Sequence, residues 1–194
     1  LEQAKDMFTW IPNPHIKMPI NKAGLQAAQK AVALGIRINM TLCFSQEQAA
    51  AVYMATLGAK RGDVFVSPFI GRLDDAGFNG TDLTGNIQKM LIQMGDGHVM
   101  NLSASIRDVF TFLHEMKTGV DIITSPFKVL EQWARGGFAQ PELDFSRKRT
   151  ELKRIAFEPG IYFAQDWYTL NINHPLTDKG IDLFSRDWNE LIKE

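Results

Sequence analysis

The sequence predicts an α/β fold in which five parallel strands alternate with helices. Two observations predict this fold: short apolar runs recur along residues 15–124, and segments with apolar residues at helical spacing separate them. Parallel strands need a crossover connection, which is usually a helix, so this order of elements favours a parallel sheet. The expected strands are residues 15–19, 36–44, 63–70, 98–105 and 120–124.

Capping residues mark the helices between these strands. Asn21 can cap the first helix, and Ser45 with Gln48 forms the pattern of a capping box before the second. Ser125 followed by Pro126 can open the fifth helix, because proline is favoured at a first helical position. The expected helices are residues 22–34, 46–57, 83–94, 109–117 and 126–133.

Other segments lack this alternation. Residues 1–14 are expected to be a connector, and residues 72–80, rich in Asp and Gly, are expected to be a loop. From residue 136 onward we expect helices at 141–155 and 177–193. An aromatic loop between them holds Tyr162, Phe163, Trp167 and Tyr168.

Composition excludes several classes of function. The chain has 194 residues and a net charge of −1, so it has no basic excess to hold a nucleic acid or an anionic membrane. No apolar run approaches the roughly 20 residues of a membrane span. The single cysteine, Cys43, forms no intrachain disulfide and suits a reducing compartment, so we expect a cytoplasmic location. We expect neither a metal nor a cofactor, since no two of the four histidines have ligand spacing: His15, His98, His114 and His174.

Small polar residues alternate with large apolar ones in three of the strands. The alternate positions are Asn39, Thr41 and Cys43, then Phe65, Ser67 and Phe69, then Asn101, Ser103 and Ser105. With a period of two, the apolar face should meet the helices and the polar face should line the interior of a barrel. A site is then expected at the carboxyl ends of the strands. The alternative is a polar barrel core whose hydrogen bonds are satisfied internally.

Lys17 lies at the end of a short apolar run in the first expected strand, two residues before Pro19. Burial disfavours the charged form of a lysine, which lowers its pKa and makes the free amine a nucleophile. The alternative is a lysine that reaches past the strand end into water.

Two arginines follow neighbouring strands at the same expected face. Arg72 comes after the third strand and Arg107 after the fourth, and with nearby serine hydroxyls they suit a phosphate monoester. The alternative is that each arginine pairs with a local carboxylate. The candidates are Asp74 or Asp75 for Arg72 and Asp108 for Arg107.

A lysine nucleophile beside a phosphate clamp suggests Schiff-base chemistry on a sugar phosphate. The segments that carry these residues resemble the transaldolases and the related fructose-6-phosphate aldolases, in order and in spacing. The segments are residues 15–19, 35–45, 66–75 and 103–107, and the tail beyond about residue 140 is similar only loosely.

The resemblance implies a role for each matching residue. Lys17 would be the Schiff-base lysine at the end of barrel strand four, while Asn39 and Thr41 on strand five would bind the sugar and position the catalytic water. Ser67 would contact substrate, and the phosphate site would consist of Arg72, Ser105 and Arg107. The implied reaction transfers a dihydroxyacetone unit between sugar phosphates in the pentose phosphate pathway.

Phe69 bears on the choice between a transferase and an aldolase. The aldolase-type members resemble one another in having a tyrosine there, whose phenol can help to protonate a carbanion, which a phenyl ring cannot do. Phe69 therefore favours transaldolase, with the aldolase as the alternative. A non-catalytic sugar-phosphate binding protein with an incomplete barrel is a further alternative.

The resemblance also implies a (β/α)8 TIM barrel of which this chain contains only strands four to eight and the C-terminal helices. We expect residues 1–135 to form that part of the barrel and residues 136–194 to form a helical extension packing on it. The missing strands, in the same or a separate chain, would carry the acid–base carboxylates. Five parallel strands cannot close a barrel, which favours such a partner. Homo-oligomerisation stays open.

Overall fold

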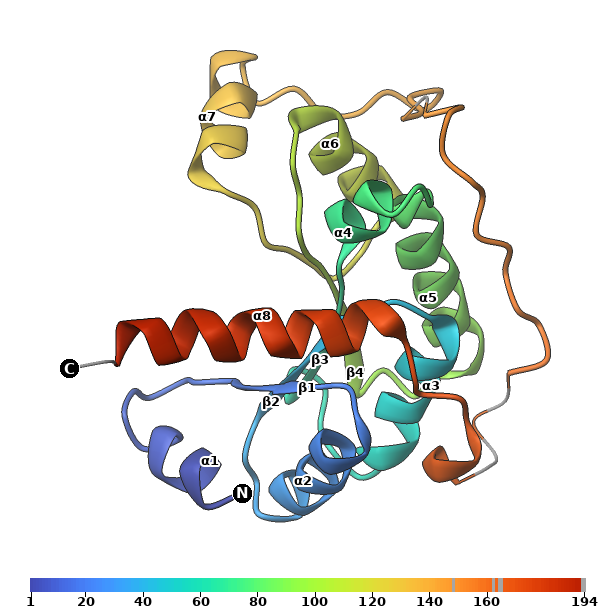
Figure 1. Ribbon diagram of the computed structural model, residues 1–194. Coiled ribbons are helices and arrows are strands. Elements are labelled where there is room, and N and C mark those ends of the chain that lie inside the picture. Colours follow the sequence, from blue (N-terminus) through green and yellow to red (C-terminus); the bar gives the residue numbers. More distant parts are fainter. Residues whose placement is uncertain (148, 162, 164–165, 193–194) are drawn as a thin grey trace.

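The computed structural model describes residues 1–147, 149–161, 163 and 166–192 as a parallel sheet with helices packed along it (Figure 1). The strands follow one another in chain order and every neighbouring pair is parallel. This result confirms the α/β class and the predicted sheet. The strands are β1 (Ile16–Pro19), β2 (Ile38–Cys43), β3 (Val64–Pro68), β4 (Val99–Ser103) and β5 (Ile122–Ile123).

Helices connect the strands and continue past the sheet. They are α1 (Glu2–Met7), α2 (Lys22–Ala33), α3 (Gln46–Ala55), α4 (Ile70–Asp75), α5 (Gly80–Met94), α6 (Val109–Thr118), α7 (Phe127–Arg135) and α8 (Pro175–Leu191), with a short 3-10 helix η1 (Trp167–Thr169). The predicted caps Asn21 and Ser45 accept hydrogen bonds from the backbone N–H groups of Gly24 and Gln48. Ser125 does not cap α7, whose N-cap is Pro126.

Three segments differ from the sequence prediction. Residues 1–14 contain α1, and the expected loop at 72–80 is preceded and partly occupied by α4. No helix forms among the described residues of 141–155, because their backbone bonds to distant residues instead: Lys153 donates to Gly77 O and accepts from Asn79. Of the predicted tail, Tyr162 and Lys193 lie outside the described residues.

The core lies between the sheet and its helices. Ile38, Met40, Val64 and Val66 are fully buried on the side of the sheet that the helices cover. Trp167, beyond residue 136, belongs to the same hydrophobic cluster. The boundary expected at residue 135 stays a prediction.

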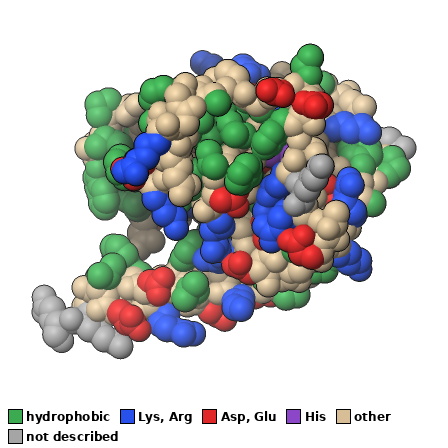
Figure 2. Space-filling model, turned by 90° about the horizontal axis from the view of Figure 1, so that it is seen from above, with side chains coloured by type: hydrophobic (Ala, Val, Ile, Leu, Met, Phe, Trp, Pro, Cys, Tyr) green, Lys and Arg blue, Asp and Glu red, His purple; other side chains and the backbone are tan. Residues whose placement is uncertain are grey.

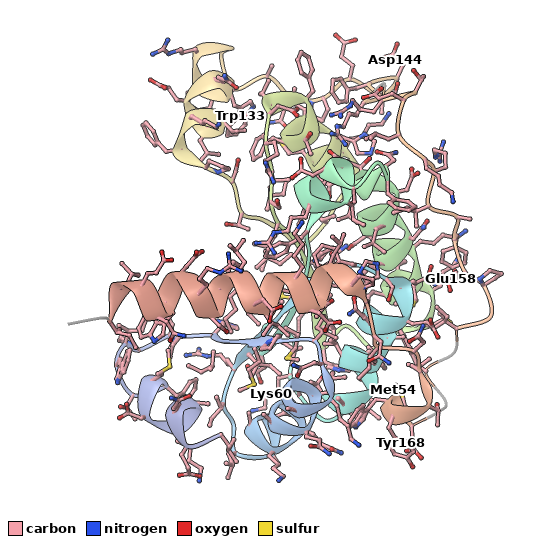
Figure 3. All side chains as sticks on the ribbon, in the orientation of Figure 1. Met54, Lys60, Trp133, Asp144, Glu158 and Tyr168 are labelled. Carbon is pink, nitrogen blue, oxygen red and sulfur yellow. The ribbon has the colours of Figure 1, made fainter. Side chains whose placement is uncertain are left out.

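A smaller cluster joins α7 to α6. Trp133 on α7 packs against Phe112 on α6, with ring centroids 5.1 Å apart (Figure 3). The same cluster includes Ile70 at the start of α4 and Ile106 after β4, so it supports the elements that carry the two candidate arginines.

The predicted direction of two polar side chains on β4 is wrong. Asn101 lies beside Val66 in the strand register, so it and Ser103 share the helix-covered side of the sheet. The amide of Asn101 donates to Thr84 O and to the Gln88 side chain, both on α5. Alternation thus gives two faces on each strand, but the register with β3 decides which face of β4 meets the helices.

The orientation of Asn101 and Ser103 toward the helices places them in a buried polar network around Glu115 of α6. Glu115 is fully buried and accepts a 3.0 Å hydrogen bond from the Thr84 hydroxyl. Its second carboxyl oxygen has no partner among the described residues, and neither does the hydroxyl of Ser103 nor Oδ1 of Asn101. Burial, first of all, raises the pKa of Glu115 to about 7.

Helix α8 crosses the carboxyl ends of the strands (Figure 1). The Thr177 hydroxyl donates to Leu42 O at 2.9 Å and accepts from Gln48 Nε2 at 2.8 Å. A Cβ on Gly180 would lie 2.6 Å from Leu42 Cδ2, so the glycine permits this close approach. The helix therefore covers the end of the sheet where the sequence places the site.

Candidate functional site

Four of the predicted residues lie side by side on β1 to β3, with Lys17 and Asn39 second in their strands and Thr41 and Ser67 nearer the carboxyl ends. Lys17 is paired in register with Asn39, and Thr41 with Ser67. The Ser67 hydroxyl donates to Oδ1 of Asn39 at 2.5 Å. This hydrogen bond uses the amide oxygen of Asn39 and leaves its NH2 group as a donor for a ligand.

Lys17 has a perturbed amine. Its side chain is exposed in the described structure, but enough protein surrounds the amine for desolvation to lower its pKa, with the positive charge of Arg72 as the second cause. Both effects disfavour the ammonium form. The fraction of nucleophilic free amine at neutral pH is therefore larger than for an ordinary surface lysine.

Phe69 and Arg72 connect Lys17 to the rest of the site. The Lys17 amine lies 5.6 Å from the centroid of the Phe69 ring, and the Arg72 guanidinium lies 5.3 Å from the same centroid. Phe184 of α8 lies on the guanidinium as well, at 5.0 Å. Two aromatic rings thus hold Arg72 in place by cation–π contacts.

A cavity of about 510 Å³ opens beside Lys17. Thr41 lines it, and the hydroxyl of this buried residue has no hydrogen-bond partner among the described residues. The opposite wall is α8, through Ser185, Trp188 and neighbouring apolar residues. The cavity therefore presents an amine and a free hydroxyl to a small polar ligand.

A second cavity of about 400 Å³ lies on the other side of Arg72. Arg72 and Arg107 both line it, together with Asp75, whose carboxylate forms a 2.9 Å ion pair with Arg107. Burial, followed by the nearby charge of Arg107, lowers the pKa of Arg72. Two cations that repel each other across one cavity favour an anionic ligand.

The local ion pairs differ from those that the alternative interpretation gives these arginines. Asp75 pairs with Arg107 rather than Arg72, and Asp74 pairs with the buried Arg147. Asp108 caps α6 by accepting from the backbone N–H of Thr111. No carboxylate among the described residues forms a salt bridge with Arg72, so its guanidinium stays available to a ligand.

Two residues at this end of the sheet have left-handed backbone conformations. Leu42 and Ser105 both have φ of 62°, a region that non-glycine residues rarely adopt. Leu42 lies at a register shift between β2 and β3 and turns its carbonyl to Thr177, while the Ser105 hydroxyl accepts a 3.4 Å hydrogen bond from Arg107. Such strain is concentrated at functional sites.

The expected helix at 177–193 was predicted only as part of an extension packing on the barrel, whereas α8 lines both cavities. Lys179 and Leu183 face the cavity of the two arginines, whereas Phe184 and Trp188 face the cavity of Lys17. In the sequence, Gly180 follows Thr177 by three residues inside the expected helix. A glycine at such a position can indicate a close contact of the helix with another element.

His15, His98 and Cys43 have structural surroundings. His15 bonds to Gly62 O and stacks on Phe65, and His98 bonds to Asp96. Cys43 is fully buried, which raises the pKa of its thiol to about 12. In the part of the chain that the structure describes, no three His, Cys, Asp or Glu side chains are placed to hold a metal. None of the described helices has the length and hydrophobicity to cross a bilayer.

These features define a class of protein: an α/β protein with a lysine amine and a cationic pocket at the carboxyl ends of parallel strands. The whole chain, residues 1–194, matches the family model described as "Transaldolase/Fructose-6-phosphate aldolase". The chain therefore belongs to the transaldolase/fructose-6-phosphate aldolase family, as the resemblance predicted.

Individual relatives agree with this assignment. The chain is 34% identical over 193 residues to a "Probable transaldolase" of Dehalococcoides mccartyi, a match that covers 100% of this chain and 68% of the relative. It is 33% identical over 194 residues to a "Probable transaldolase" of Caldicellulosiruptor saccharolyticus, covering 100% and 69%. A "Probable transaldolase 2" of Listeria monocytogenes is 33% identical over 188 residues, covering 97% and 66%.

Proposed function

We propose that the protein is a transaldolase that transfers a dihydroxyacetone unit between sugar phosphates through a Schiff base on Lys17. The observation that carries the proposal is the position of Lys17. Its amine has a lowered pKa and lines a cavity that lies beside a second, cationic cavity. Arg72 lies between the two, within cation–π distance of the ring that Lys17 also approaches. A ketose phosphate has a carbonyl and a phosphate at opposite ends, which suits this pair of cavities.

The proposed reaction begins with attack of the Lys17 amine on the ketose carbonyl. Loss of water gives an iminium, which accepts the electron pair of the C3–C4 bond when the C4 hydroxyl loses its proton. The aldose phosphate leaves, and the dihydroxyacetone unit stays on Lys17 as an enamine. The enamine then attacks a second aldose phosphate, and hydrolysis of the new iminium releases the product and the lysine.

Other residues have supporting roles in this proposal. The free hydroxyl of Thr41 and the NH2 group of Asn39 would hold the water and the sugar hydroxyls at the iminium. Ser67 would fix the orientation of Asn39 through their hydrogen bond. Arg72, Arg107 and the Ser105 hydroxyl would bind the phosphate.

A complete (β/α)8 barrel would close this site. The outer edge of β1 pairs with no strand among the described residues, and α8 leaves Trp188 62% exposed beside the Lys17 cavity. Further strands at this edge would pair with β1, cover α8 and bring the carboxylates for proton transfer, since no carboxylate among the described residues lines the Lys17 cavity. We also propose a cytoplasmic location, the pentose phosphate pathway as the context and residues 136–194 as an extension that covers the barrel.

Borohydride trapping tests the nucleophile. Incubation with fructose 6-phosphate and borohydride should leave one reduced dihydroxyacetone adduct on Lys17, located by peptide mass spectrometry. The adduct should be absent from Lys17→Met and present in the matched control Lys30→Met, which removes an exposed lysine from α2. An adduct on another lysine would refute the assignment, and no adduct at all would favour a non-catalytic sugar-phosphate binder.

Product analysis separates the transferase from the aldolase. With an aldose phosphate acceptor present, a transferase forms a new ketose phosphate and releases little dihydroxyacetone. Phe69→Tyr would place a phenol near the carbanion, so we expect this variant to release more dihydroxyacetone than the wild type. Equal release of dihydroxyacetone by both proteins would mean that Phe69 does not decide between transferase and aldolase activity.

A further inference from the structure

Helix α8 brings one more cation to the cavity of the two arginines. Lys179 lines this cavity together with Arg72 and Arg107. It reaches the cavity from a helix that lies far along the chain from both arginines, so the sequence pattern around them does not include it. The cavity is thus enclosed by α4, the segment after β4, and α8.

The packing of α8 on neighbouring elements determines the position of Lys179. Thr177 anchors the first turn of the helix on Leu42 O, and Gly180, next to Lys179, lies directly against Arg72: a Cβ there would be 2.7 Å from Nη1 of the guanidinium. One turn further, Phe184 covers the same guanidinium. These contacts hold the helix so that the Lys179 side chain opens onto the cavity.

The charges in this cavity do not balance. Three cationic side chains line it against one carboxylate, Asp75, which is already paired with Arg107. Asp187 of α8 is a further negative charge close enough to Arg72 to oppose the lowering of its pKa, but it does not line the cavity. Figure 2 shows that acidic and basic side chains are otherwise mixed over this view of the surface. A cavity with this excess of positive charge suits an anion that carries more than one negative charge.

We propose that Lys179 is a third cation of the phosphate-binding site, carried by α8 and directed at the phosphate monoester of the sugar substrate. This inference rests on the proposed function and adds a specificity-determining residue to it. The two arginines offer planar, fixed donors, of which Arg72 is held between two aromatic rings. Lys179 adds a compact charge on a flexible stem, which can follow the phosphate as the substrate moves through the reaction.

Direct binding of inorganic phosphate tests this inference without requiring catalysis. At fixed ionic strength, calorimetric titration of purified Lys179→Met should show phosphate binding weakened by about tenfold relative to wild type, the low end for a charge-assisted hydrogen bond at a partly exposed place. Lys179→Arg should restore most of the affinity. The matched control is Arg186→Met, which removes a cation from the same helix two turns away, about 10 Å along its axis, and should bind phosphate as the wild type does.

A second readout links binding to the substrate. Lys179→Met should reduce Lys17 trapping with fructose 6-phosphate more than trapping with unphosphorylated dihydroxyacetone. Equal weakening by Lys179→Met and Arg186→Met would mean a general electrostatic effect and would overturn the inference, as would unchanged phosphate affinity in Lys179→Met or no phosphate binding by the wild type. Failure of trapping with intact, Lys179-dependent phosphate binding would instead refute the Schiff-base function alone.

Discussion

Glu115 allows the clearest quantitative prediction, because its carboxyl group is fully buried with one oxygen that has no partner among the described residues. Burial, which is only partly offset by the hydrogen bond from Thr84 and the charge of Arg147, raises its pKa from 4.5 to about 7. In the unfolded chain the group ionises near its ordinary pKa. Between about pH 4.5 and 7 the folded protein therefore holds a proton that the unfolded chain has lost, so the free energy of unfolding falls as the pH rises through this window.

The size of this loss follows from the shift. At about 1.4 kcal/mol per pKa unit, the rise corresponds to about 3 kcal/mol of stability that is present at pH 4.5 and lost by pH 8. Glu115→Gln keeps the shape and the acceptor for Thr84 without ionising. We therefore expect the variant to be about as stable as the wild type at pH 4.5 and about 3 kcal/mol more stable at pH 8.

Urea unfolding at several pH values between 4.5 and 8 measures this difference, and comparing the two proteins cancels the titration of all other groups. Glu190→Gln on α8 is the control, because it removes an exposed carboxylate and should change stability by less than about 0.5 kcal/mol at any pH. A wild-type minus variant difference that stays constant from pH 4.5 to 8 would refute the reasoning about Glu115.

Two further predictions concern the close contact of α8 with Leu42 and the charge of Arg72. Gly180→Ala should lower the free energy of unfolding in urea by about 1 kcal/mol, since overpacking against buried Leu42 outweighs the gain in helix propensity. The control Gly85→Ala on α5, where a Cβ meets nothing nearer than 4.0 Å, should be stabilising, and stabilisation by both changes would contradict the argument. Arg72→Met should raise the pKa of Lys17, seen as a shift of its trapping with dihydroxyacetone to higher pH, and an unshifted profile would exclude the coupling.

The sheet could be predicted from the sequence because its determinants are local. Buried parallel strands are short apolar runs, and capping residues such as Asn21 and Ser45 act within three residues along the chain. Consecutive parallel strands lie side by side, so the order of the strands is enough to place β1, which carries Lys17, next to β2, which carries Asn39.

The errors arose where distant residues decide the conformation. Residues 141–155 have helical spacing, but Arg147 pairs with Asp74, Arg154 pairs with Asp82, and Lys153 pairs its backbone with residues near the end of α4. These contacts hold the described residues of the segment in a non-helical conformation. The same is true of Asn101, whose direction depends on its register with β3 and on acceptors in α5.

Lys17 and the cavity of the two arginines are coupled through Arg72. Desolvation is the larger cause of the lowered pKa of Lys17, and the charge of Arg72 is the second. A phosphate bound at Arg72 would neutralise that second cause and favour the ammonium form of Lys17. The substrate would at the same time fill the cavity of about 510 Å³ and expel its water, which strengthens the first cause. Substrate binding would thus change the two causes in opposite directions, and the pH profile of Lys17 trapping with fructose 6-phosphate, compared with that for dihydroxyacetone, measures which one dominates.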